Sequence, residues 1–198
     1  MAGHLTAGAD YAERLTRVQE AGWKRLLDVQ APYRWHVRSL RLGRTLDVGC
    51  GIGRNLAHLR GEAVGVDHNP AMVAASRARG FRAWTTAEWA SCPDAVPGAF
   101  DSLLVAHVVE HMTEEEALGV LSTYLPFLRP GGRVALVTPQ ERGYATDATH
   151  VRFVSFAELR TLCERLGLAV EMERSFPFPR AVGRIFPYNE FVTVARLP

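Results

Sequence analysis

The sequence predicts an α/β fold built on a parallel β-sheet, and two patterns indicate it. From residue 44 onward, short apolar segments with strand character alternate with segments of helical periodicity, which is the order of βαβ units. One such segment, Ser102–Ala106, is apolar almost throughout, as a strand covered on both faces requires. A length of 198 residues suits a single domain, which we expect to span residues 1–198.

Seven segments are expected to form strands. The first five are Thr45–Gly49, Ala63–Asp67, Phe81–Thr85, Ser102–Ala106 and Arg133–Thr138. After the last expected helix, Leu168–Arg174 and Glu190–Arg196 are predicted as two further strands, joined by a loop rich in proline and aromatic residues.

Capping residues mark several expected helix starts. Asn69-Pro70 combines an N-cap residue with proline at the first helical position. The segments Thr113–Glu116 and Ser155–Glu158 have the spacing of capping boxes, so each is expected to open a helix. Pro130-Gly131-Gly132 is expected to end the fourth helix and to lead into the fifth strand.

The first 40 residues have no strand signal and are predicted to form helices. Apolar residues recur at helical spacing over Tyr11–Val29, and a second helix is expected over Tyr33–Leu40, after Pro32. We therefore expect residues 1–40 to form a helical cap on a core made by residues 41–198.

Composition and charge fit an ordinary folded protein. Hydrophobic residues make up 47% of the chain and charged residues 22%, and the net charge of +2 does not indicate a nucleic-acid surface. The apolar runs are shorter than the roughly 20 residues that span a bilayer, and the N-terminal residues do not resemble a secretory signal. The three widely spaced cysteines suit reduced thiols. A cytoplasmic protein without membrane contact is expected.

The strongest chemical signal is a glycine-rich turn, Asp47–Gly53, that follows a predicted strand and precedes a predicted helix. That context is the one a nucleotide-binding loop requires. A dinucleotide site needs a small residue at the sixth position counted from Gly49, where this chain has Arg54, and no Gly-Lys-Ser/Thr follows as in a phosphate loop. Asp67, at the end of the second strand, is able to accept two hydrogen bonds from a ribose diol. A nucleoside without a pyrophosphate is therefore the expected ligand.

Four segments together resemble the class I S-adenosylmethionine-dependent methyltransferases. They are Leu46–Gly53, Gly65–Pro70, Phe100–His111 and Leu128–Gly132, and the resemblance covers residues 44 to about 170. It implies a Rossmann-like, seven-stranded sheet, mostly parallel with an antiparallel C-terminal hairpin and with helices on both faces. It also implies S-adenosylmethionine as cofactor and S-adenosylhomocysteine as product.

The resemblance also implies where the cofactor binds. The expected cofactor-binding residues are Asp47, Gly49, Cys50, Gly51, Gly53, Asp67, His68, Ala87, Glu88, Ala106 and His107. Asp67 should hold the ribose. A threonine stands where many relatives have an acidic residue for the adenine amino group, so the backbone of Ala87 or the side chain of Glu88 is expected to meet the adenine.

The string His107–His111 matches the H-x-x-E-H pattern of some zinc proteases, but that pattern needs a helix and here it follows a strand. Some metal-assisted methyltransferases place Glu and His at this point, and His150 could join them, whereas similar strings are common in methyltransferases that use no metal. No metal is therefore expected, and a divalent ion is kept as an alternative. His150 and His111 are the expected general bases, although positioning alone supplies much of the catalysis of methyl transfer.

The acceptor site is expected to draw on the long polar loop Thr138–Phe153 and on the N-terminal cap. The candidate acceptor residues are Tyr144 and Asp147 from the loop and Tyr33 and Trp35 from the cap; the aromatic stretch Phe176–Arg180 is a further candidate wall. The expected activity is methyl transfer to a small-molecule oxygen or nitrogen in natural-product or glycan metabolism. An RNA or protein methyltransferase and a non-catalytic S-adenosylmethionine-binding module remain as alternatives.

Overall fold

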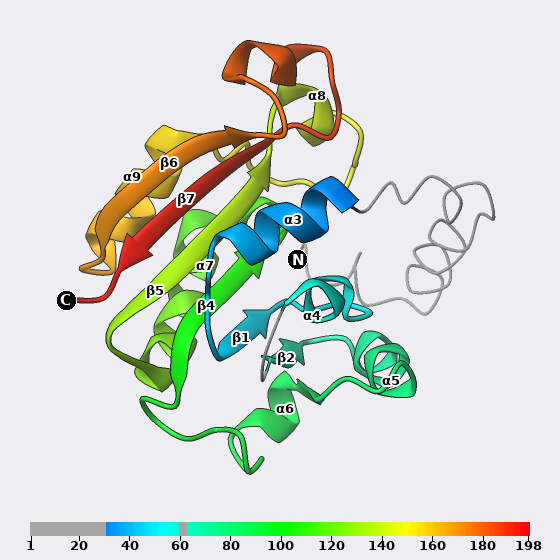
Figure 1. The fold of residues 1–198 in the computed structure, drawn as a ribbon, viewed down its shortest axis with the longest axis vertical. Helices are drawn as coiled ribbons and strands as arrows, with labels where there is room; N and C mark the ends of the chain where they lie inside the picture. Colours follow the sequence, from blue (N-terminus) through cyan, green and yellow to red (C-terminus); the bar gives the residue numbers. More distant parts are fainter. Residues whose placement is uncertain (1–30, 60–62) are drawn as a thin grey trace.

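A seven-stranded mixed sheet forms the centre of the computed structural model, which describes residues 31–59 and 63–198 (Figure 1). The strands are β1 (Thr45–Val48), β2 (Ala63–Asp67), β3 (Ala83–Thr85), β4 (Phe100–Ala106), β5 (Leu128–Pro139), β6 (Ala169–Phe176) and β7 (Glu190–Arg196). Their order is β3-β2-β1-β4-β5-β7-β6. The first five strands are parallel, and β7 is antiparallel to both β5 and β6. The predicted fold class is confirmed.

Helices cover both faces of this sheet. They are α3 (Ala31–Ser39), α4 (Arg54–His58), α5 (Pro70–Ala78), α6 (Thr86–Trp89), α7 (Glu114–Tyr124), α8 (Glu141–Tyr144) and α9 (Phe156–Arg165), with short 3₁₀ turns η2 (Val109–His111), η3 (Leu125–Phe127) and η4 (Arg180–Arg184). In Figure 1, α7 and α9 lie behind the sheet and α3 crosses in front of it.

The predicted helix starts are confirmed. The Asn69 side chain accepts a hydrogen bond from the amide of Ala71, and Pro70 occupies the first position of α5. Both predicted capping boxes, Thr113–Glu116 and Ser155–Glu158, close reciprocally. These motifs depend only on residues three or four apart, which is why the sequence identifies them.

Some predicted boundaries are wrong. Pro130-Gly131-Gly132 does not end a helix: α7 ends earlier, before η3, where Pro126 has no amide hydrogen to continue the helical ladder. Those three residues lie inside β5, at an irregularity where the pairing with β4 shifts register. Phe81 also lies outside β3, because its amide closes the turn after α5 by donating to the carbonyl of Ser76. The helix predicted over Tyr11–Val29 lies outside the described residues.

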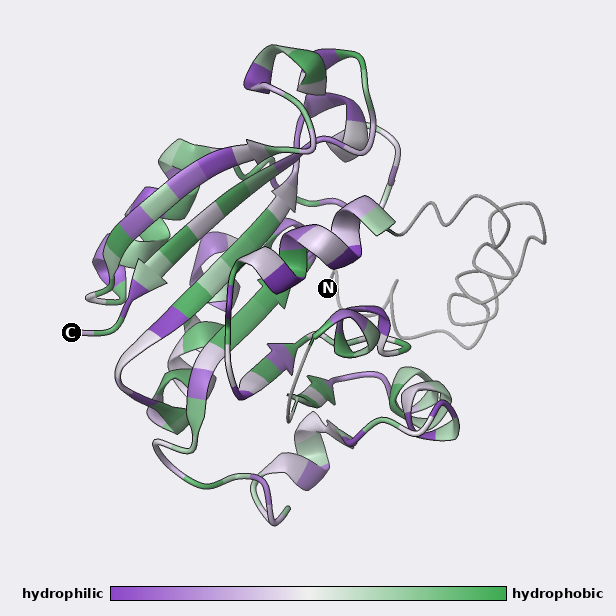
Figure 2. Ribbon diagram, in the orientation of Figure 1, coloured by the Kyte–Doolittle hydropathy of each residue, from purple (hydrophilic) through white to green (hydrophobic). Residues whose placement is uncertain are grey.

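The core is divided by the sheet into two apolar layers. Leu103 and Val105 of β4 pack with residues of α7 and α9, whereas Leu104 between them packs in the layer under α3. This alternation explains the continuous apolar run of β4, which Figure 2 shows as a hydrophobic strand. The described part of the chain contains no helix that is long and apolar enough to cross a membrane.

The strand order places a crevice at one edge of the sheet. From β1 the chain continues to β2 and β3 on one side of the sheet, and from β4 it continues to β5 on the other side. The loops that follow β1 and β4 therefore lead away from each other at the carboxyl ends of these strands. The glycine turn follows β1 and His107 follows β4. Because β7 is antiparallel, its first residue, Glu190, lies at the same edge, opposite Pro139 of β5.

Candidate active site

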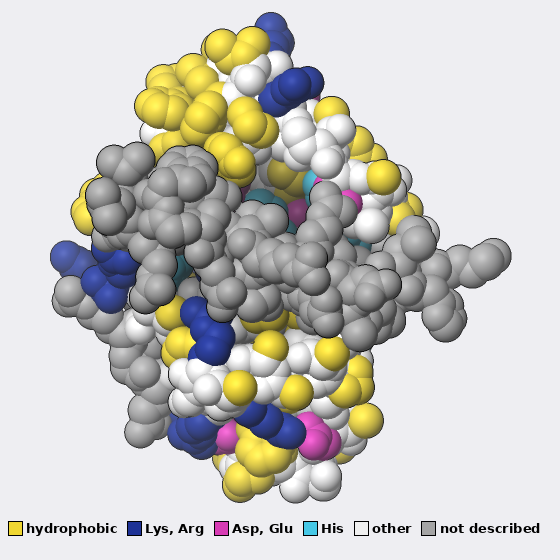
Figure 3. Space-filling view, turned by 90° about the vertical axis from the view of Figure 1, so that its right-hand side faces the viewer, with side chains coloured by type: hydrophobic (Ala, Val, Ile, Leu, Met, Phe, Trp, Pro, Cys, Tyr) yellow, Lys and Arg dark blue, Asp and Glu magenta, His cyan; other side chains and the backbone are white. Residues whose placement is uncertain are grey.

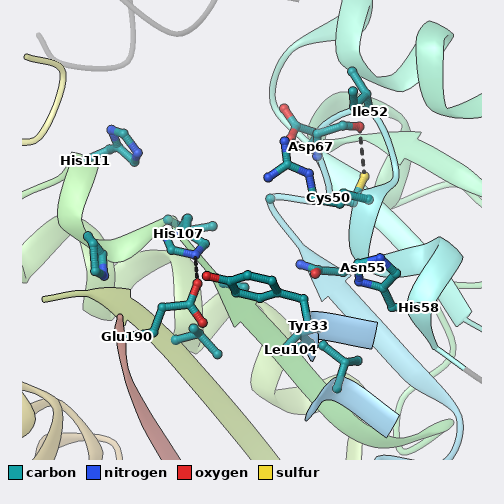
Figure 4. A pocket seen from close by; sticks show the side chains of 18 of the residues that line it. Tyr33, Cys50, Ile52, Asn55, His58, Asp67, Leu104, His107, His111 and Glu190 are labelled. Carbon is teal, nitrogen blue, oxygen red and sulfur yellow. Dashed lines mark hydrogen bonds and ion pairs between the residues drawn. The ribbon is translucent and has the colours of Figure 1, made fainter. Parts of the chain in front are cut away.

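A cavity of about 630 Å³ occupies this crevice (Figure 4). Its walls come from the glycine turn with α4, the ends of β2 and β4, helix α3 and the start of β7. From these elements, the lining residues include Gly49, Cys50, Gly51, Arg54, Asn55, His58, Asp67, His68, Ala106, His107, His111, Tyr33, Pro187, Tyr188 and Glu190. Asp67 and Cys50 face His107, His111 and Glu190 across the cavity in Figure 4.

The glycine turn needs glycine for two different reasons. Gly49 and Gly51 both have positive φ, 77° and 52°, a conformation that other residues adopt with strain. A Cβ atom at Gly49 would lie 2.4 Å from the Val108 side chain, so close packing also requires glycine there. A Cβ atom at Gly51 would meet nothing within 4 Å, so its open side is available to a ligand.

Asp67 fixes the turn from the end of β2. Its Oδ2 accepts a hydrogen bond of 2.8 Å from the amide of Gly51, and its Oδ1 accepts one of the same length from the amide of Asn69. An ionised carboxylate has about four lone-pair sites, so each oxygen retains capacity for a further donor such as a ribose hydroxyl. The His68 imidazole lies 3.5 Å from Oδ1 and half-exposed at the cavity.

Asp47 lies fully buried and is not part of the cavity wall. Neither of its carboxylate oxygens has a hydrogen-bond partner among the described residues. Burial raises its pKa to about 7; the nearby Asn55 amide opposes the shift and the Asp67 charge adds to it. Burial also raises the pKa of the neighbouring Cys50 thiol, so this cysteine stays protonated. Orphaned acceptors beside a turn with an open side fit a ligand that carries hydrogen-bond donors.

His107 begins the opposite wall in a strained conformation, with a φ of 58°. Its Nε2 lies 2.8 Å from an oxygen of Glu190, and its Nδ1 lies 3.3 Å from an oxygen of the buried Glu110. Desolvation lowers the pKa of His107, but the two carboxylates outweigh it and raise the pKa to about 10. The two carboxylates therefore favour the imidazolium form of His107, which has no lone pair to accept a proton.

His111 and His150 have a defined tautomer. Nδ1 of His111 lies 3.2 Å from the carbonyl oxygen of Thr149, and Nδ1 of His150 lies 2.7 Å from that of Tyr144. A carbonyl only accepts hydrogen bonds, so in the neutral form of either ring the proton is on Nδ1 and the lone pair is on Nε2. Burial lowers the pKa of His111, which favours its neutral form. Of these two histidines, only His111 lines the cavity.

Glu110, His111 and His150 form the candidate metal cluster among the described residues. One possible ligand atom from each side chain lies within 4.8 Å of the others. The Glu110 carboxylate is fully buried and, apart from its ion pair with His107, has no hydrogen-bond partner among the described residues. This arrangement matches the alternative, raised from the sequence, that His150 approaches the H-x-x-E-H string.

Several predicted site residues lie away from the cavity. Glu88 closes a capping box with Thr85 at the start of α6 and forms a 2.9 Å ion pair with Arg77, so its carboxylate is already engaged. Residues outside the cavity wall also include Gly53, Ala87, Trp35 (64% exposed), Tyr144 and Asp147. Tyr144 and Asp147 nevertheless belong to the loop that carries His150, with Asp147 accepting a hydrogen bond of 2.7 Å from the Thr149 hydroxyl. Their assignment to ligand binding stays a prediction.

Sequence reasoning missed Glu190 and Tyr188. Glu190 is a charged residue directly before the apolar pair Phe191 and Val192 of β7, and this is a local signal that it faces a polar site. Its position beside His107 depends on β7 being antiparallel, and 83 residues separate the two side chains in the chain. Tyr188 precedes it in the aromatic loop, and its carbonyl accepts a 2.7 Å hydrogen bond from the Tyr33 hydroxyl.

Residues 46–134 match a family model described as a methyltransferase domain. The matched range contains the glycine turn, Asp67 and the histidine string after β4. These residues, a little under half of the chain, are therefore similar to a methyltransferase domain.

Several known proteins with similar sequence or structure are described as methyltransferases. Ribosomal protein L11 methyltransferase of Ralstonia pickettii (strain 12J) is 38% identical over 103 residues, which cover 50% of this chain. The match covers 33% of that protein, so the chain spans about a third of the relative's length. Magnesium protoporphyrin IX methyltransferase of Synechocystis PCC 6803, solved with bound S-adenosylhomocysteine, has a TM-score of 0.66 at 17% identity, over 98% of this chain and 96% of its own. An S-adenosylmethionine-dependent methyltransferase of Archaeoglobus fulgidus has a TM-score of 0.62 at 20% identity, over 83% and 92%. At these identities the solved structures show a common fold.

Proposed function

We propose that the chain transfers a methyl group from S-adenosylmethionine to an oxygen or nitrogen atom of a small-molecule acceptor. The observation that supports this most directly is the continuity of the cavity. Gly51 and Asp67 on one wall face His111 and Glu190 on the other, so a donor and an acceptor would meet in one recess. Its volume of about 630 Å³ lies in the usual range for small-ligand sites and suits a small acceptor, or the end of a larger one.

The residues contribute mainly by positioning. S-adenosylmethionine supplies an activated methyl group; the acceptor atom bonds to the methyl carbon, the carbon–sulfur bond breaks with its electrons moving to sulfur, and the acceptor releases its proton. Asp67 and the turn fix one end of this arrangement. The Nε2 lone pair of His111 is the best-placed acceptor for the released proton, because His107 is already protonated. His150 would support it from the adjacent ring, 4.8 Å between centroids.

A metal-assisted version of the same reaction is the second candidate, and the cluster of Glu110, His111 and His150 favours it. A carboxylate oxygen and two imidazole nitrogens are suitable ligands for a divalent transition-metal ion. Such an ion would act as a Lewis acid that lowers the pKa of an acceptor hydroxyl. Activity that is lost on chelation and restored by a divalent ion would support this version, and activity unaffected by a chelator would exclude it.

Net charge and sequence similarity both bear on the class of acceptor. A net charge of +2 gives little support to an RNA substrate. The similarity to a ribosomal protein methyltransferase keeps a protein acceptor as an alternative. A natural-product or glycan hydroxyl remains our first proposal.

A product-release assay tests the proposal. S-adenosylhomocysteine formation would be measured with panels of small hydroxyl and amine compounds, and with protein and RNA fractions as separate arms. Turnover with a small compound, reduced about 100-fold or more by His111→Gln, is expected. Turnover retained by His111→Gln and by His150→Gln would remove the base role. Turnover only with protein or RNA would replace the acceptor class, and binding of the cofactor without any turnover would favour the non-catalytic module.

A further inference from the structure

An exposed aromatic surface stands at the mouth of the cavity, on the segment between β6 and β7. The Phe186 ring contacts the rings of Phe178 and Tyr188 edge-on, with centroids 5.3 and 5.6 Å apart. Phe178 is 47% exposed, Tyr188 62% and the neighbouring Ile185 77%. We call these four residues the aromatic platform. Figure 3 shows hydrophobic side chains gathered at the upper end of that face, above a hollow with histidine and acidic side chains.

A buried polar network holds the platform in place. Asn189, which is fully buried, donates hydrogen bonds of 2.9 Å to Gln140 Oε1 and Ser175 Oγ. Its Oδ1 accepts a 2.9 Å hydrogen bond from the amide of Phe178 itself. The Gln140 amide in turn donates to the carbonyl of Glu190. The rings are therefore displayed from a fixed base, as in binding sites where rigid elements support exposed contact residues.

The platform continues directly into the cavity. Tyr188 belongs to both, and Pro187 beside it also lines the cavity. Two residues after Tyr188, Glu190 contacts His107 in the wall of the cavity. Two arginines of η4 flank the platform: Arg180 pairs with Glu141 at 2.8 Å, and Arg184 directly precedes Ile185.

Contiguous exposed apolar surface is uncommon on soluble proteins and marks a place where something binds. Aromatic side chains give a large contact area at low entropic cost. We propose that the aromatic platform binds the aromatic or apolar body of the acceptor, while the hydroxyl or amine of that acceptor extends into the cavity toward His111. This inference rests on the proposed function, and it narrows the acceptor to an amphipathic molecule rather than a free sugar or a small polar metabolite.

Binding of 2-naphthol tests the inference, because this probe has an aromatic body, one hydroxyl and its own fluorescence. With the protein saturated with S-adenosylhomocysteine, we expect Phe178→Ala and Tyr188→Ala each to weaken naphthol binding about tenfold. Phe178→Tyr, which keeps the ring, should bind naphthol normally. Val96→Ala is the matched control, since Val96 is an exposed apolar residue (51%) outside the platform. S-adenosylhomocysteine affinity should change less than twofold in Phe178→Ala, Phe178→Tyr and Val96→Ala, whose residues lie outside the cavity wall.

Three results would overturn the inference. The first is naphthol affinity that is equal in the wild type and the two alanine variants, or absent in a wild type that binds S-adenosylhomocysteine. The second is sedimentation of the wild type, but not Phe178→Ala, with phosphatidylcholine vesicles. The third is a dimer in solution that Phe178→Ala dissociates. A wild type that fails to bind S-adenosylhomocysteine contradicts the proposed function instead, so the two failures are distinguishable.

Discussion

The buried carboxylate of Asp47 lowers the stability of the folded protein. Its carboxylate is fully buried without a hydrogen bond among the described residues, and its pKa is raised to about 7. A buried charge that destabilises the free protein is typical of a binding site whose ligand supplies the missing partner. Because the carboxylate is buried only in the folded state, its effect can be measured as a pH dependence of the free energy of unfolding.

Asp47→Asn is expected to stabilise the cofactor-free protein, and more so at higher pH. The folded state of the wild type binds the Asp47 proton more tightly than the unfolded state does. The stability of the wild type therefore falls as pH rises from about 4 to about 7, and the loss is complete above that range. Thermal melts should show the variant melting roughly 5 °C higher than the wild type at pH 8, with a smaller difference at pH 5. A pH-independent difference would contradict this assignment.

Gly49 and Gly51 differ in what an added methyl group meets. Gly49→Ala should destabilise the protein by about 3 kcal/mol or more, because it combines left-handed strain with a clash against Val108. Gly51→Ala should cost only the strain, about 1–2 kcal/mol, but should weaken S-adenosylhomocysteine binding by more than that cost explains. Chemical denaturation and calorimetry separate the two effects. Normal S-adenosylhomocysteine affinity in Gly51→Ala would show that the open side of this turn does not face the ligand.

At the scale of elements, the segment between β6 and β7 depends on Asn189. Asn189→Ala would leave Gln140, Ser175 and the amide of Phe178 without their buried partner. We expect a loss of about 3 kcal/mol in the free energy of unfolding, measured by urea denaturation. Thr123→Ala removes one exposed hydrogen bond on α7 and serves as a control, with an effect below about 0.5 kcal/mol. A loss no larger than that of the control would show that the network does not hold this segment.

Helix starts are predictable from local sequence patterns, whereas features that depend on contacts between distant residues are not. The capping boxes and the Asn69-Pro70 start involve neighbouring residues, so the sequence alone identifies them. Pro130-Gly131-Gly132 has the composition of a turn, yet it lies within β5, where the amide of Gly131 donates to the carbonyl of Leu197 and the amide of Leu197 donates to the carbonyl of Gly132. Glu88 is a candidate for binding the adenine from the sequence, but its carboxylate caps α6 and pairs with Arg77. The ion pair with Arg77 depends on the fold and is not visible in the sequence motif.

The same contrast applies to the candidate site. The glycine turn and Asp67 were predictable because a strand, three glycines and an acidic residue at the next strand end form a pattern along the chain. Glu190 was not, because it meets His107 only through the antiparallel insertion of β7 between β5 and β6. The grouping of His150 with His111 was suggested by residue type, and the loop that carries His150 brings them together.

At the scale of the whole molecule, the β1–β4 switch point explains why one cavity combines residues from Tyr33 to Glu190. A ligand bound in this cavity should contact both of its walls and raise the free energy of unfolding. S-adenosylhomocysteine at 100 times its dissociation constant should contribute about 2.7 kcal/mol, which corresponds to a rise in Tm of roughly 5–10 °C. NAD at the same concentration serves as the control and should leave the Tm unchanged.

Calorimetric titration of the full chain with S-adenosylhomocysteine and NAD is the most direct test of the central claim, that this cavity is a methyl-donor site. The account predicts one S-adenosylhomocysteine bound per chain and at least tenfold weaker binding by Asp67→Ala, because this substitution removes both the proposed ribose contact and the hydrogen bond to the amide of Gly51. His68→Ala, at a half-exposed neighbour, should have a smaller effect. Tighter binding of NAD than of S-adenosylhomocysteine, or S-adenosylhomocysteine binding unchanged by Asp67→Ala, would contradict the account.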